Sequence, residues 1–96
     1  MFTVVRTKVF ERDLKHYLSK GGDTEKVRAI FKHLQQGSSL PPWLRDHQLQ
    51  GKLRAYREMH VDHDWLLVYE KNSKQLRIVC LWLVSHKKLR ERERSL

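Results

Sequence analysis

The stretch Lys52–Val84, KLRAYREMHVDHDWLLVYEKNSKQLRIVCLWLV, decides the fold because it reads as three successive strands. Side-chain character alternates with a period of two through Lys52–Val61, Trp65–Glu70 and Gln75–Val84, which is typical of half-buried strands. The polar segment Lys71–Lys74 predicts a hairpin turn between the second and third. The third strand is apolar on both faces toward its end, which predicts a central position in the sheet.

The preceding residues predict one short strand and two helices. Met1–Arg6 contains adjacent β-branched valines and opens the sheet. Apolar residues then follow the helical spacing of three and four, and glycines end both helices, at Gly21–Gly22 and at Gly37. Asp23 or Thr24 caps the second helix. The apolar faces are Phe10, Leu14, Tyr17 and Leu18 in the first helix, and Val27, Ile30, Phe31 and Leu34 in the second.

The predicted order is β-α-α-β-β-β, an α+β fold in which a two-helix hairpin packs on a small, mainly antiparallel sheet. Its 96 residues are one domain, 1–96, with a mixed-charge tail at 87–96 that is helical or frayed. Cys80 is alone among apolar neighbours, which favours a packed thiol and a cytoplasmic protein. We expect no membrane association, since no apolar run is long enough to span a bilayer.

The net charge favours a polyanionic partner. Twenty lysines and arginines against eleven acidic residues give +9, and such a field attracts nucleic acid. The alternative is a basic surface with no nucleic-acid role.

Histidines and an aspartate are predicted to meet at one rim of the sheet. In a meander, the strand that ends at His60, the turn that contains Asp64 and the strand that precedes His86 all reach the same end. His47 precedes the strands and joins them only if the first strand is short or bent, or if the segment Leu49–Gly51 folds back, which Gly51 permits. Histidine exchanges protons near neutrality, so the cluster suits acid–base chemistry.

The alternation also predicts an open, basic face suited to RNA. It places Arg54 and His60 on that face and Leu53, Ala55 and Met59 on the helix-covered core. Phosphate-contact candidates are Lys52, Arg54 and Arg57, although Arg57 alternatively belongs to a core-side network. Trp65 is either a core aromatic or a surface on which a base stacks. Zinc is disfavoured because His60 and His63 straddle a turn and no cysteine pair supports them.

The two segments at 46–70 and 76–89 resemble the YafQ branch of the RelE-type toxins of bacterial toxin–antitoxin pairs. The matching motifs are Asp46-His47-x-Leu49-Gln50-Gly51, Tyr56-Arg57-Glu58-x-His60-Val61-x-x-Asp64-Trp65 and Ser85-His86. The chain departs from the family pattern at Arg90, where an aromatic residue is common. The tail RERERSL also extends past the usual end.

The resemblance implies a microbial ribonuclease fold, cleavage of messenger RNA in the ribosomal A site, and inhibition by a cognate antitoxin through which any DNA contact occurs. It assigns the leading catalytic role to His86. The supporting site residues that it implies are His47, His60, Asp64 and Trp65.

Two functional hypotheses follow. The first is a metal-independent endoribonuclease without a cofactor, in which the RNA 2′-OH attacks the adjacent phosphorus. His86 is then the acid, His60 or Asp64 the base, and His47 assists. The second is a non-catalytic basic module that binds RNA or the ribosome.

Overall fold

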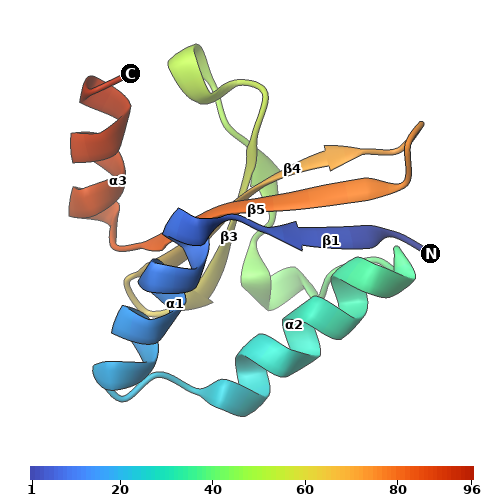
Figure 1. Ribbon diagram of the computed structural model, residues 1–96, viewed down its shortest axis with the longest axis horizontal. Helices are drawn as coiled ribbons and strands as arrows, with labels where there is room; N and C mark the ends of the chain where they lie inside the picture. The colour runs from blue at the N-terminus through green and yellow to red at the C-terminus, as the bar shows by residue number, and fades with distance from the viewer.

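The computed structural model describes all 96 residues and forms a five-stranded mixed sheet with helices on both faces (Figure 1). The elements are β1 (Thr3–Arg6), α1 (Lys8–Ser19), α2 (Thr24–Gln36), the 3₁₀ turn η1 (Pro42–Leu44), β2 (His47–Gln48), the 3₁₀ turn η2 (Gly51–Leu53), β3 (Arg57–Asp62), β4 (Trp65–Asn72), β5 (Arg77–Val84) and α3 (His86–Arg94). The strand order is β1-β5-β4-β3-β2, and only β1 and β5 run parallel. The predicted α+β class and order are confirmed, with β2 as an addition, and the tail expected to be helical or frayed forms the helix α3. None of the helices has the length and apolar character needed to cross a membrane.

Two apolar clusters lie on the two faces of the sheet. The helices α1 and α2 cover one face, which contains Met59 and the cysteine predicted to be packed, Cys80. The other face is covered by α3 and by the segment between β2 and β3. Figure 1 shows α3 on the opposite side of the molecule from α2. This second cluster consists of Leu53, Leu66, Val68, Trp82, Val84 and Leu89.

The region before β3 differs from the prediction. The expected strand at 52–61 begins only at Arg57, because Gly51, at φ 65°, starts a 3₁₀ turn instead. That turn places Leu53 in the second cluster and leaves Ala55 exposed, so neither belongs to the helix-covered core. The face expected to be open is therefore partly covered. The fold-back near Gly51 occurs, and β2 pairs antiparallel with β3.

Side chains of α1 complete the outer edge of β5 where β1 ends. β1 pairs with β5 only as far as Cys80. Beyond it, Thr7, the N-cap of α1, donates its hydroxyl to the Leu81 carbonyl at 3.2 Å. The Asp13 carboxylate accepts the Leu83 amide at 3.1 Å. These contacts satisfy backbone groups that a short edge strand leaves without partners.

We expect Leu66→Ala to lower the free energy of unfolding by about 2–5 kcal/mol, because Leu66 is fully buried and the substitution leaves a cavity. Leu96→Ala is the matched control, since Leu96 is 63% exposed, and its effect should stay within about 0.5 kcal/mol. Urea unfolding of both variants measures the difference, and equal losses would contradict the assignment of the second cluster as a core.

Candidate functional site

Three histidines form a row on the face of the sheet opposite α1 and α2. His47 comes from β2, His60 from β3, and His86 is the first residue of α3. The ring centroids of His47 and His60 are 6.1 Å apart, and those of His60 and His86 are 5.8 Å apart. The structure thus brings together the three histidines that the sequence analysis selected, including His47.

His86 is oriented by Asp64, which lies in the turn between β3 and β4. Nδ1 of His86 is 2.6 Å from Oδ1 of Asp64, and the His86 backbone amide donates to the same oxygen at 3.2 Å. These hydrogen bonds hold the pKa of the Asp64 carboxyl below its usual range. With Nδ1–H on the carboxylate, Nε2 of His86 is left to exchange protons with a substrate.

His47 lies between two oxygen acceptors. Its Nδ1 is 2.8 Å from the Arg45 carbonyl, and its Nε2 is 3.2 Å from Oε2 of the buried Glu58. The Arg45 backbone is left-handed, at φ 50°, a conformation that non-glycine residues rarely adopt. Both ring nitrogens therefore face acceptors, and the ring donates to both when it carries its second proton.

His60, in the middle of the row, has a different environment. Its Nδ1 is buried and has no hydrogen-bond partner. Burial, and next the positive charge of Arg45, lower the pKa of His60, while the Glu58 carboxylate opposes them. His60 is consequently neutral near pH 7 and able to accept a proton.

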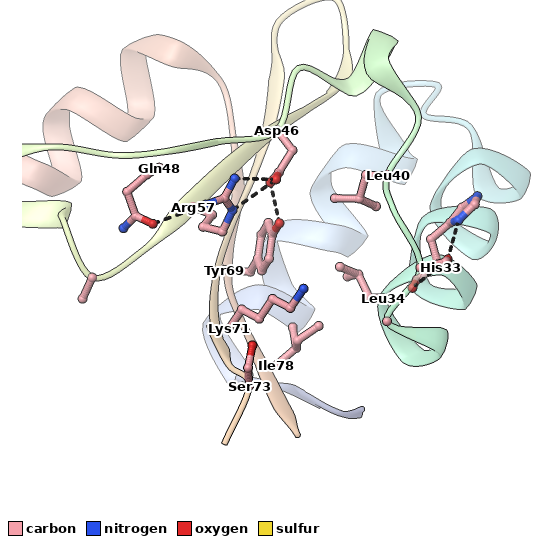
Figure 2. Close-up of a pocket in the computed structure, with 13 residues that line it drawn as sticks. His33, Leu34, Leu40, Asp46, Gln48, Arg57, Tyr69, Lys71, Ser73 and Ile78 are labelled. Carbon is pink, nitrogen blue, oxygen red and sulfur yellow. Dashed lines mark hydrogen bonds and ion pairs between the residues drawn. The ribbon is translucent and has the colours of Figure 1, made fainter. Parts of the chain in front are cut away.

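Arg57 lies on the opposite face, in a network that the sequence left open as an alternative. Its Nη2 donates to Oδ2 of Asp46 at 2.7 Å, and the Tyr69 hydroxyl donates to the other carboxylate oxygen. Figure 2 shows this network at a cavity of about 360 Å³ between β3, β4 and the end of α2. Arg57 therefore contributes to the helix side of the molecule and not to the histidine face.

The remaining candidates lie outside the row. Lys52 and Arg54 are exposed in and just after η2, before β3 begins. Trp65 is partly buried against α1, with its ring 5.2 Å from that of Tyr17, which matches its core-aromatic alternative. No group of three or more His, Cys, Asp or Glu side chains is arranged to hold a metal ion.

Two further residues of the site have no assigned role in the sequence analysis. Glu58 carried a signal, since it alternates with His60 on the same strand face. Arg45 has no such sequence signal, because its contact with His47 and its effect on His60 depend on a backbone conformation that the sequence does not reveal.

Comparisons with known proteins agree on one family. The family model described as "Bacterial toxin of type II toxin-antitoxin system, YafQ" matches residues 2–91. The mRNA interferase toxin YafQ of Escherichia coli K12 is 33% identical over 69 residues, which is 71% of this chain and 75% of that protein. A metal-bound toxin from Helicobacter pylori superposes with a TM-score of 0.84 at 32% identity, covering 93% of this chain and 99% of that one. A chain of the E. coli DinJ–YafQ complex gives 0.77 at 28% identity, with coverages of 93% and 98%.

The lowered pKa of His60 predicts how stability depends on pH. The unfolded chain binds a proton at His60 near pH 6.5, whereas the folded chain binds it only at lower pH. The stabilising contribution is therefore complete above about pH 6.5 and is lost as the pH falls from there through the folded pKa. We expect NMR titration to place the pKa of His60 below about 6.5.

Urea unfolding at several pH values provides a second measurement. The loss of stability on acidification should shrink in His60→Gln and persist in the control His63→Gln, since His63 is exposed outside the row. A His60 that titrates above its ordinary value would refute this reading of its environment.

Proposed function

This chain belongs to the YafQ family of type II toxin–antitoxin toxins, whose curated relatives are named mRNA interferases, and we propose that it cuts messenger RNA in the ribosomal A site by metal-independent acid–base chemistry. The observation that carries this proposal is the row of three histidines, each in a different hydrogen-bonding environment. Cleavage needs a proton acceptor, a proton donor and a positive charge, and the row offers a side chain for each.

His60 is the proposed general base. The geometry favours it over Asp64, because the Asp64 carboxylate is already bound to the ring and backbone of His86. A neutral His60 accepts the proton of the 2′-OH while the 2′ oxygen forms its bond to phosphorus. Because Nδ1 is buried, Nε2 is the nitrogen proposed to take the proton, which requires the tautomer with the hydrogen on Nδ1.

His86 is the proposed general acid. As the bond between phosphorus and the 5′ oxygen breaks, Nε2–H of the protonated ring donates its proton to that oxygen. The Asp64 carboxylate, 2.6 Å from Nδ1, keeps the ring oriented for the transfer. The products are a 2′,3′-cyclic phosphate and a 5′-OH end, and both transferred protons are accounted for.

His47 is the proposed electrostatic group for the phosphorane oxygens. Glu58 and the Arg45 carbonyl hold its ring beside His60. When the ring is protonated, its positive charge stabilises the negative charge that develops on the phosphorane oxygens. Further out, Lys52 and Arg54 are proposed phosphate contacts, and the partly exposed Trp65 a surface for a base. Arg57 is removed from that set, because its guanidinium is bound to Asp46.

The proposed partner in the cell is a cognate antitoxin. The superposed E. coli chain was solved as a DinJ–YafQ toxin–antitoxin complex, and the +9 charge of this chain suits a partner with an acidic segment. We propose that the antitoxin, and not this chain, contacts operator DNA. The proposed site of action is the cytoplasm, where the messenger RNA that the toxin cuts is translated.

We expect His86→Ala to lower the rate of cleavage of ribosome-bound message by about 10²–10⁴-fold, since it removes the general acid. His33→Ala is the control, because His33 lies on α2, away from the histidine row, and is hydrogen-bonded to Ser38. Cleavage should be unchanged when the wild-type protein is treated with EDTA and the chelator is removed before the ribosomes are added. Full activity in the His86 variant would refute His86 as the general acid, whereas a wild type that binds the programmed ribosome without cutting would favour the non-catalytic binding module.

The proposed chemistry also depends on the message. A 2′-deoxy nucleotide on the 5′ side of the cleaved bond should abolish cleavage at that site, because the nucleophile is absent, while binding persists. Analysis of the product ends should show the cyclic phosphate in the unmodified message. Cleavage of the deoxy substrate at an unchanged rate would exclude attack by the 2′ oxygen.

A further inference from the structure

A partly buried ion pair connects the charged tail to the body of the protein. Arg92, in α3, donates from Nη1 and Nη2 to the two carboxylate oxygens of Asp13 in α1, both at 2.8 Å. Asp13 is only 8% exposed. The guanidinium also stacks over the ring of Trp82, with its carbon 5.5 Å from the ring centroid. Paired bonds of this kind fix orientation as well as distance.

The same carboxylate also holds the strand that leads to the site. Asp13 accepts the Leu83 amide at 3.1 Å, three residues before His86. One side chain thus joins α1, the end of β5 and the later part of α3. His86 lies between the two tethered points, at the first residue of α3.

Few other contacts hold α3 in place. Leu89 is its one buried residue, and Ser85 caps its start. The Lys88–Glu91 ion pair, at 3.7 Å, lies within α3 and does not bind the helix to the rest of the protein. A nine-residue helix with so small an apolar face is marginal on its own. The Asp13–Arg92 pair therefore decides whether the later part of α3 stays docked.

We propose that Asp13 and Arg92 are positioning residues that hold His86 in the orientation required of the general acid. By fixing β5 and α3 on either side of it, they keep Nδ1 of His86 on Asp64 and direct Nε2 toward the phosphate. This rests on the proposed function for the role of His86, although the positioning itself is a property of the fold. Arg92 lies one residue beyond the segment that the family model matches, whereas Asp13 lies within it.

The test compares three full-length variants with the wild type. Arg92→Ala removes the pair, Arg94→Ala removes an equal charge from an exposed position two residues further on, and Arg92→Lys retains one charged donor. We expect Arg92→Ala to lower kcat for cleavage of ribosome-bound message on the order of tenfold to a hundredfold, with KM unchanged. Arg94→Ala should match the wild type, and Arg92→Lys should recover part of the loss.

NMR relaxation of the His86 ring and of the α3 amides provides a readout that does not depend on activity. Arg92→Ala should make the ring and the helix more mobile while His60 is unaffected, and thermal unfolding should show that the variant remains folded at the assay temperature. A His86 ring that becomes mobile in Arg92→Ala, together with a wild type that does not cleave the message, would support the positioning and refute the proposed function. The proposal is overturned if Arg92→Ala resembles Arg94→Ala in both measurements, or if KM alone rises.

Discussion

The site depends on one rung of the sheet, at Leu66. This β4 residue pairs with His60 of β3 on one side and with Val84 of β5 on the other. Through this rung, His60 lies two strands away from Val84, the residue that precedes Ser85 and His86. A shift of β3 by one residue would turn His60 into the helix-covered core and Met59 toward the site. Burial of Leu66 on the second face therefore fixes the distance between the proposed base and acid.

The chain obtains three chemical roles from one residue type by varying what surrounds each ring. His60 has a buried, unpartnered nitrogen, His86 has a carboxylate, and His47 has an acceptor at both nitrogens. The three rings therefore differ in their hydrogen-bonding partners although the side chain is the same. A shift of register after His60 contributes, because it turns Asp62 to the other face, where Tyr17 and Lys26 bind it. That aspartate is thereby kept away from the histidine row.

Much of this arrangement could be predicted from periodicity and topology. The helices, β4, β5 and the shared rim of His60, Asp64 and His86 follow from apolar spacing and from the meander. The segment before β3 could not be predicted, because its alternating residues imitate a strand. Gly51 instead starts a turn that carries Leu53 to the second face. The role of Asp46 was also hidden, since it binds Arg57 and Tyr69 at separations of 11 and 23 residues.

The remaining element, α3, shows how a charged sequence acquires a structural role. Its composition alone predicts a solvated tail. In the structure, Leu89 is its single buried side chain. The parallel strand β1 ends before β5 does, so α1 must supply polar side chains to the exposed edge, and Asp13 is one of them. A buried carboxylate with one backbone partner still requires a counter-charge, and Arg92 provides it. Asp13 therefore has two partners: it closes the outer edge of β5 at Leu83, and it binds α3, the helix whose first residue is His86.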